Sequence, residues 1–99
     1  MLRVAIRCVD GVVTFDPQAA STSIGQDGGS FIFENYDNHP HQPNPDDSTT
    51  FGVWCPDPIP AGTPGKPTPS ILNTVSNVSV IPYTCKLDTK LKGSINFTA

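Results

Sequence analysis

The 99-residue chain is poor in charge, in long apolar runs and in helix-forming segments. Charged residues make up 15% of it, and a net charge of −3 argues against the basic surface that non-specific nucleic-acid binding needs. No apolar run reaches the roughly 20 residues of a membrane-spanning helix. Arg3, Arg7 and Asp10 interrupt the apolar segment that an N-terminal signal peptide would require. We therefore expect no membrane span and no leader, in a chain that is intracellular or a mature or excised form beginning at an added Met.

Turn-forming residues are abundant instead, with 11 prolines and 8 glycines. Short runs alternate between apolar and polar residues, and no segment has helical periodicity. Asp10-Gly11 is typical of a two-residue hairpin turn. The strands expected from these patterns cover residues 2–8, 12–15, 21–24, 30–36, 71–72, 75–83 and 93–98, with a polar, basic loop at 86–92. The sequence predicts an all-β fold, an antiparallel Greek-key β-sandwich of about seven or eight strands.

Most of the prolines lie in the segment 43–69. Each proline removes a backbone donor and fixes φ, so no long strand or helix fits there. We predict an ordered loop in extended and polyproline-like conformations, inserted into a single domain that spans residues 1–99. Phe51, Val53 and Trp54 are expected to hold this loop against the core, because these side chains are costly to leave in water. The alternative is a mobile linker.

The chain has three cysteines, at positions 8, 55 and 85. They form no Cys-x-x-Cys pattern, which argues against a zinc knuckle. Cys8 and Cys55 could form a disulfide in an oxidising compartment and leave Cys85 free. Alternatively, Cys8 is a small core residue, since it continues the apolar face of the strand at 2–8.

The segment 83–95, which reads YTCKLDTKLKGSI, resembles the C-terminal ligand loop of the cupredoxins, the small blue copper proteins. Short-loop, amicyanin-like members of that family read Tyr-x-Cys-x-x-His-x-x-Met-x-Gly-x-Val/Ile, and Tyr83, Cys85, Gly93 and Ile95 fit this pattern without a gap. The loop of the family joins two paired strands and fixes three copper ligands.

Two N-terminal segments extend the resemblance. Residues 31–41, FIFENYDNHPH, are similar to the family's strand that carries an Asn and is followed by a Pro-His with the first copper ligand. Residues 12–17 loosely resemble its Phe-x-Pro stretch. The resemblance covers residues 1–42 and 75–97, and the proline-rich segment has no counterpart in it.

The resemblance implies a copper site, because a trigonal His₂Cys set with a weak axial Met suits both oxidation states of copper. On this alignment His41 matches the first His and Cys85 the thiolate. Asp88 replaces the second His and Leu91 the axial Met. A carboxylate is a harder ligand that favours Cu(II), and an apolar axial residue should raise the reduction potential. The expected metal ligands are therefore His41, Cys85 and Asp88, with copper as the cofactor.

Three interpretations of this locus stay open. One is an altered copper site, with His39 as a possible further ligand, although an exposed turn histidine is the ordinary explanation of His39. Another is a metal-free cupredoxin-like binding or structural module, whose interaction surface would be the segment 43–69. The third is a chance Tyr-x-Cys motif in an unrelated sandwich.

The resemblance also implies an electron-transfer protein rather than an enzyme, with a redox or structural protein partner and an extracytoplasmic location, periplasmic or secreted. Lys86, Lys90 and Lys92 would then form a docking patch for an acidic partner. An enzymatic alternative would pair Cys85 with His41, oriented by Asp37 or Asp88. We disfavour it because a thiol buried in apolar surroundings, as Cys85 would be beside Leu91, is inert.

Two triplets, Asn77-Val78-Ser79 and Asn96-Phe97-Thr98, match the N-glycosylation sequon. Both fall in predicted strands, and such triplets arise often by chance. The sequence therefore favours no modification at either site.

Overall fold

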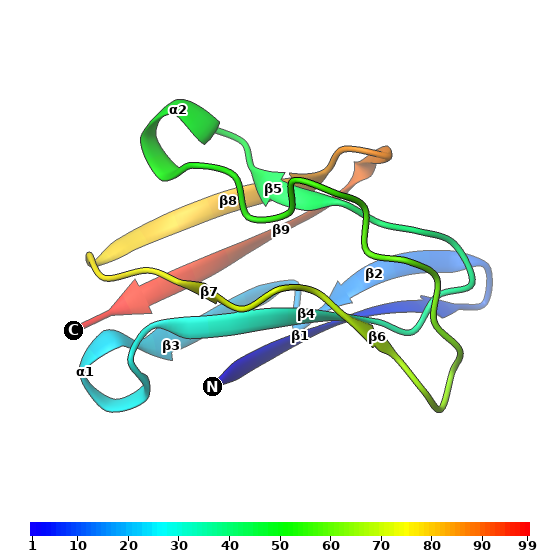
Figure 1. Ribbon diagram of the computed structural model, residues 1–99, viewed down its shortest axis with the longest axis horizontal. Coiled ribbons are helices and arrows are strands. Elements are labelled where there is room, and N and C mark those ends of the chain that lie inside the picture. The colour runs from blue at the N-terminus through cyan, green and yellow to red at the C-terminus, as the bar shows by residue number, and fades with distance from the viewer.

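A computed structural model describes residues 1–99, which form two packed β-sheets (Figure 1). The first sheet contains β1 (Leu2–Val9), β2 (Val12–Asp16), β4 (Ser30–Asn35), β6 (Thr68–Pro69) and β7 (Asn73–Thr74), in the order β2-β1-β4-β6 with β7 also paired to β4. The second contains β3 (Ala19–Ser23), β5 (Pro43–Pro45), β8 (Ser79–Cys85) and β9 (Asp88–Thr98), in the order β3-β9-β8-β5. Two one-turn helices, α1 (Ile24–Asp27) and α2 (Ser48–Phe51), complete the fold. The predicted all-β sandwich is confirmed.

The predicted hairpin at Asp10-Gly11 is present, with φ of 53° and 78° at these two residues. The expectation that all strands are antiparallel is wrong. β4 pairs with β1 in parallel, and β3 pairs with β9 in parallel. The chain crosses from one sheet to the other after β2, and side chains alternate in the same way in parallel and antiparallel strands, so the sequence pattern does not reveal this crossing.

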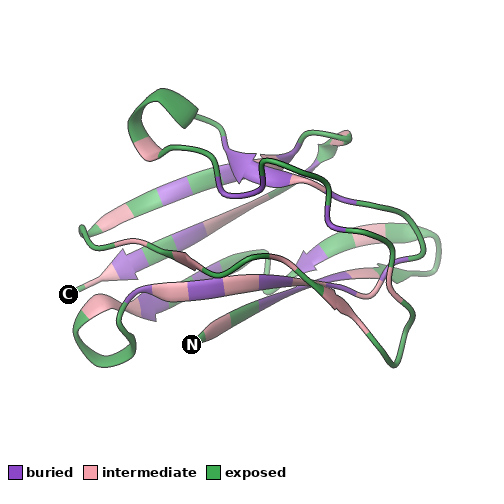
Figure 2. Cartoon of the chain, in the orientation of Figure 1, coloured by how far each residue is buried: buried purple, intermediate pink, exposed green.

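The core lies between the two sheets, and buried and exposed positions alternate along the strands that enclose it (Figure 2). Many of the buried side chains are aromatic. Tyr83 lies among its neighbours with ring centroids 4.7 Å from Phe15 and 5.2 Å from Phe33. Phe31 and Trp54 pack edge to face at 4.8 Å. Burial of each such side chain stabilises the fold by about 1.5–3 kcal/mol. β4 is central in its sheet, as its apolar sequence predicts.

The proline-rich segment 43–69 packs against this core, as predicted. Trp54 is only 3% exposed and holds the segment against the core. Val53 is 53% exposed and does not anchor the segment, contrary to expectation. The segment includes a helical turn, α2, because the Asp47 carboxylate accepts a hydrogen bond from the Thr50 amide at 3.1 Å.

Only Lys86 and Leu87 of the predicted polar loop at 86–92 form a turn, and residues 88–92 belong to β9. β8 turns at Lys86 and Leu87, and β9 begins at Asp88, which pairs with Cys85. Thr84 pairs with Lys92, so the ladder is irregular between Thr84 and Cys85. The pairing of β8 with β9 extends past the apolar part of the segment because backbone hydrogen bonds, not side-chain polarity, hold a ladder together.

The strand predicted at 75–83 begins only at Ser79, and residues 71–72 belong to no strand. Within β8, Ile81, Tyr83 and Cys85 face the core as expected, and Val80 faces solvent. No helix is long and apolar enough to cross a membrane.

Neither expectation for Cys8 is met. All three thiols are free, so there is no Cys8–Cys55 disulfide, and Cys8 is exposed rather than buried. Cys8 pairs with Val13 in the hairpin. At this end β1 extends beyond the packed core, and the exposure of Val9 and Val12 shows the same effect.

Candidate metal centre

The segment that follows β4 is held in place by one buried amide side chain. Asn35 Nδ2 donates to the carbonyl of His39 at 2.9 Å and to that of Pro60 at 3.1 Å. Its Oδ1 accepts a hydrogen bond from the Asp37 amide at 2.9 Å. Because Asn35 is fully buried, these bonds fasten the turn at 36–40 to the proline-rich segment.

The backbone of His41 is fixed by a two-way pairing with Ile59. The His41 amide donates to Ile59 O at 3.2 Å, and the Ile59 amide donates to His41 O at 2.7 Å. Strand β5, which begins two residues after His41, pairs with the end of β8, so that Pro43 lies opposite Cys85. Segments that are far apart in sequence thereby bring His41 and Cys85 together.

The structure places the Nδ1 atom of His41 3.5 Å from the Sγ atom of Cys85, and both side chains are buried. The backbone amide of Gln42 donates to the same sulfur at 3.3 Å. Two donors at this separation can share one ion, since bonds of about 2.3 Å to sulfur and 2.0 Å to nitrogen enclose an angle of roughly 110° at the metal.

The other ring nitrogen of His41 has a carboxylate partner. Nε2 lies 2.7 Å from Asp37 Oδ2, with the two side chains only 5% and 3% exposed. A proton on Nε2 donates to this carboxylate and leaves the Nδ1 lone pair facing Cys85. A histidine that binds metal commonly has such a partner, which fixes its tautomer and makes it more basic.

These contacts move two pKa values in opposite directions. The hydrogen bond to Cys85 raises the pKa of His41, and Asp37 raises it further, against the opposing effect of burial. Burial raises the pKa of the Cys85 thiol, but the hydrogen bond shared with His41 and the one donated by the Gln42 amide, with smaller effects of the Leu87 and Asp88 amides, outweigh it and leave the pKa lowered. The prediction that Cys85 lies in apolar, inert surroundings is therefore wrong, because its sulfur contacts His41 and the Gln42 amide.

Asp88 is half-buried and lines a pocket of about 410 Å³ beside His41, but one of its oxygens accepts a hydrogen bond from the Lys90 amide at 3.2 Å. No three His, Cys, Asp or Glu side chains are grouped closely enough to hold one ion. Leu91, which the family resemblance aligns with the axial Met, is 4% exposed. The structure thus brings His41 and Cys85 together and leaves Asp88 at the rim.

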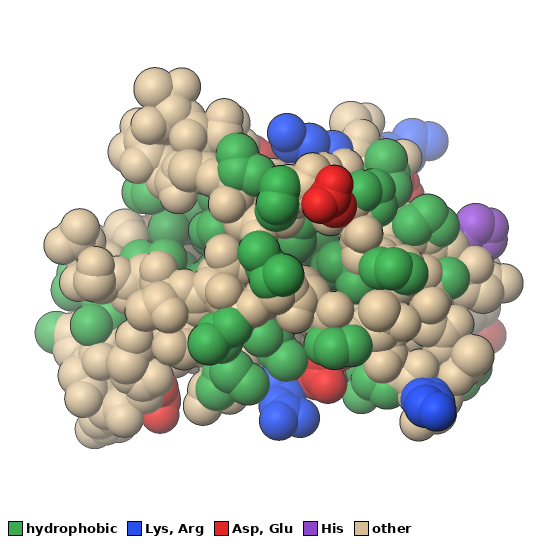
Figure 3. All heavy atoms as spheres, in the orientation of Figure 1, with side chains coloured by type: hydrophobic (Ala, Val, Ile, Leu, Met, Phe, Trp, Pro, Cys, Tyr) green, Lys and Arg blue, Asp and Glu red, His purple; other side chains and the backbone are tan.

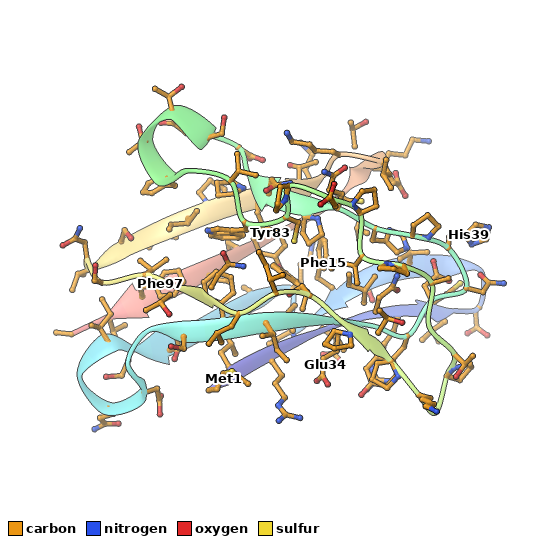
Figure 4. All side chains as sticks on the ribbon, viewed as in Figure 1. Met1, Phe15, Glu34, His39, Tyr83 and Phe97 are labelled. Carbon is orange, nitrogen blue, oxygen red and sulfur yellow. The ribbon has the colours of Figure 1, made fainter.

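His39 lies on the other side of His41. Its Nδ1 is 3.8 Å from Asp37 Oδ2, and its side chain is 75% exposed. Figure 4 shows it pointing outward at one end of the molecule, far from Tyr83 in the centre. An exposed turn histidine is what the sequence favoured for this residue.

Two contributors to the site have little sequence signal. Gln42 acts through its backbone amide, and its side chain donates to the carbonyls of Cys55 at 3.0 Å and Pro56 at 3.2 Å. Ile59 acts through its backbone pairing with His41. A backbone donor can come from any residue type except proline, so the only sequence signal for Gln42 is its position next to His41.

No protein-family model and no curated protein matches the sequence. Several solved structures do match the fold. A purple cupredoxin from Nitrosopumilus maritimus is 15% identical, with a TM-score of 0.75 over 99% of this chain and 100% of that one. A plastocyanin from Dryopteris crassirhizoma is 16% identical, with a TM-score of 0.69 over 97% and 99%.

A copper-containing nitrite reductase from Thermus scotoductus is 19% identical with a TM-score of 0.64, and this chain covers 22% of it. The two sheets, the position of Cys85 at the end of β8 and these similarities together define the chain as a protein with the cupredoxin fold. The fold implied by the sequence resemblance is confirmed.

Proposed function

We propose that this protein is an extracytoplasmic, non-enzymatic cupredoxin that binds copper at an altered site and transfers electrons to or from a protein partner. The observation that carries the proposal is the 3.5 Å contact between His41 Nδ1 and Cys85 Sγ. A thiolate and an imidazole are the two donor types that copper prefers in proteins.

The residues present fit copper through these two donors. Cys85 and His41 would hold the ion, and Asp88, which lines the adjacent pocket, would supply the third ligand. Bound copper supplies one-electron redox chemistry. The chain itself contributes the orientation of His41 through Asp37 and the hydrogen bond from Gln42 to the sulfur.

The same arrangement limits how the site works. With Asp88 as a ligand, the carboxylate would favour Cu(II) over Cu(I) compared with histidine, and the apolar Leu91 would supply no further ligand. Electron exchange in such a site is slower than in a trigonal His₂Cys centre, because the two oxidation states demand different ligands. Lys86 lies in the turn between β8 and β9, Lys90 and Lys92 lie in β9, and together these lysines would attract an acidic partner.

A metal-free binding module is the second candidate. The observation that favours it is that no three candidate ligands are grouped in the structure. In that case the rigid segment 43–69 would supply the binding surface. In Figure 3 one face of the molecule carries apolar side chains among uncharged ones, with few charges.

Titration of the metal-free protein with Cu(II), followed by visible absorption and metal analysis, tests the proposal. We expect one copper per chain and an intense thiolate-to-copper band that is absent in Cys85→Ser. Cys8→Ser is the control for the exposed thiol, which pairs with Val13 in the β1–β2 hairpin and has no hydrogen bond to His41, and this variant keeps the band.

Two further results discriminate the candidates. Copper bound without the band in the wild type contradicts Cys85 as a ligand, and no bound copper leaves the metal-free module. The double variant Asp88→His/Leu91→Met should give a stronger, more typical blue centre. If it gives no coloured site, the assignment of positions 88 and 91 is wrong even though the fold is right.

A further inference from the structure

In the Asn77-Val78-Ser79 triplet, Asn77 lies in a bend and only Ser79 belongs to a strand, as the first residue of β8, which corrects the expectation that the whole triplet lies in a strand. Asn77 is exposed, between the end of β7 and the start of β8. The one hydrogen bond at this residue is donated by the Ser79 hydroxyl to the Asn77 carbonyl, at 3.1 Å. Its side-chain amide is therefore free to react.

The second triplet is placed differently. Asn96 is exposed but lies in the middle of β9, opposite Ser21 of β3 on one side and Val80 of β8 on the other. An enzyme that modifies the folded chain must draw the acceptor triplet into its own site. At Asn96 this disrupts the pairing of β9 with two strands, whereas at Asn77 it disturbs only the end of β8, where Ser79 pairs with Phe97.

We infer that Asn77 is an N-glycosylation acceptor and that Asn96 is not. The donor is a lipid-linked oligosaccharide pyrophosphate. Asn77 Nδ2 forms a bond to the anomeric carbon of the first sugar, the bond from that carbon to the phosphate oxygen breaks, the lipid pyrophosphate leaves, and Nδ2 loses one proton to a base of the transferase. This inference rests on the extracytoplasmic location proposed above.

The position of Asn77 suits a bulky group. The bend lies at the end of the molecule that holds the C-terminus, whereas Cys85 is at the other end of β8 (Figure 1). Strand rise of about 3.3 Å per residue puts roughly 20 Å between the two ends of β8. A glycan at Asn77 therefore leaves the candidate copper site open.

The neighbourhood of Asn77 also has apolar side chains that a glycan would shield. Val78 is 66% exposed and Val80 is 61% exposed. Asn77 borders a shallow groove of about 360 Å³ between α2 and the β7–β8 bend, so the first sugar has room beside the chain.

The test is to secrete the full chain, behind a heterologous leader, from a host that N-glycosylates, and to map peptides by mass spectrometry before and after peptide N-glycosidase treatment. We expect one glycan at position 77, removed by the glycosidase with conversion of Asn77 to aspartate. Asn77→Gln and Ser79→Ala lose it, and the matched control Asn96→Gln keeps it. Occupancy at Asn77 should exceed that at Asn96 at least tenfold.

A second arm presents the purified, folded protein to an oligosaccharyltransferase and its lipid-linked donor, so that only triplets accessible in the fold react. An unmodified wild-type chain in both arms, or a glycan on Asn96 equal to that on Asn77, overturns the inference. Circular dichroism of Asn77→Gln checks that the fold is unchanged. Copper titration of the same samples reports on the proposed function separately, because a chain with the band and no glycan fails only the present inference.

Discussion

Cys85 and Cys55 are almost equally buried, at 0% and 2% exposed, yet the pKa values of their thiols are shifted in opposite directions. Burial and the nearby Cys85 raise the pKa of Cys55 to about 11 from its ordinary value of 9.0. Cys85 is buried to the same degree, but it also shares a hydrogen bond with His41 and accepts one from the Gln42 amide, and its pKa is lowered. Burial alone therefore does not decide the direction in which the pKa of a thiol moves; the hydrogen bonds to the sulfur do.

The largest expected effect comes from the residue that holds Cys55 in place. Asn44 is buried, and its Oδ1 accepts hydrogen bonds from the amides of Trp54 and Cys55 at 2.8 Å each, while Nδ2 donates to Cys55 O at 2.9 Å. Asn44→Ala leaves these buried groups unpaired and should lower the free energy of unfolding by about 3 kcal/mol.

Chemical denaturation measures this loss. Asn77→Ala is the matched control, since Asn77 is exposed and its side chain has no partner, and it should change stability by less than about 0.5 kcal/mol. Equal effects of the two substitutions contradict a structural role for Asn44.

The pH dependence of the free energy of unfolding should reveal the raised pKa of Cys55. The folded pKa of Cys55 is raised, so its contribution is complete below pH 9.0, the unfolded value, and is lost as the pH rises through about 11. Two pKa units correspond to a loss of at most about 2–3 kcal/mol. Denaturation of the wild type and of Cys55→Ala between pH 8 and 11.5 measures the difference, which we expect to narrow with rising pH. A constant difference contradicts the raised pKa.

The smallest expected effect tests how Asp37 acts on the site. Asp37→Asn keeps a hydrogen-bond partner for His41 Nε2 but removes the charge, so the pKa of His41 should fall and that of the Cys85 thiol should rise. Nitrogen chemical shifts of His41 in the metal-free protein report its tautomer and pKa, and ultraviolet thiolate absorption reports Cys85.

Asp46→Asn is the control for this pair. Asp46 accepts a hydrogen bond from Thr84, the residue before Cys85, at 2.6 Å, but it does not contact His41. This substitution should leave the His41 tautomer unchanged. A shift of His41 in Asp46→Asn as large as in Asp37→Asn contradicts the specific role of Asp37.

The sequence predicted the strands and turns whose signals are local. The alternation around Phe31, the hairpin turn at Asp10-Gly11 and the inward positions of Tyr83 and Cys85 all follow from residue type and period. It missed features that depend on where an element ends relative to the core. Cys8 continues an apolar face and is nevertheless exposed, because β1 extends beyond the packed region.

By itself, then, the sequence determined the all-β class, the two-sheet architecture implied by the family resemblance, and the pairing of position 41 with position 85. The all-β class depends on side-chain period, which the chain carries locally, and the architecture and the pairing are what the family resemblance implied. Only the tertiary structure decided the parallel crossings between the sheets, the contact of His41 with Asp37, the backbone donors to the sulfur of Cys85 and the free bend at Asn77. The physical reason is that strand partners, backbone hydrogen bonds and solvent exposure are properties of segments brought together from distant parts of the chain.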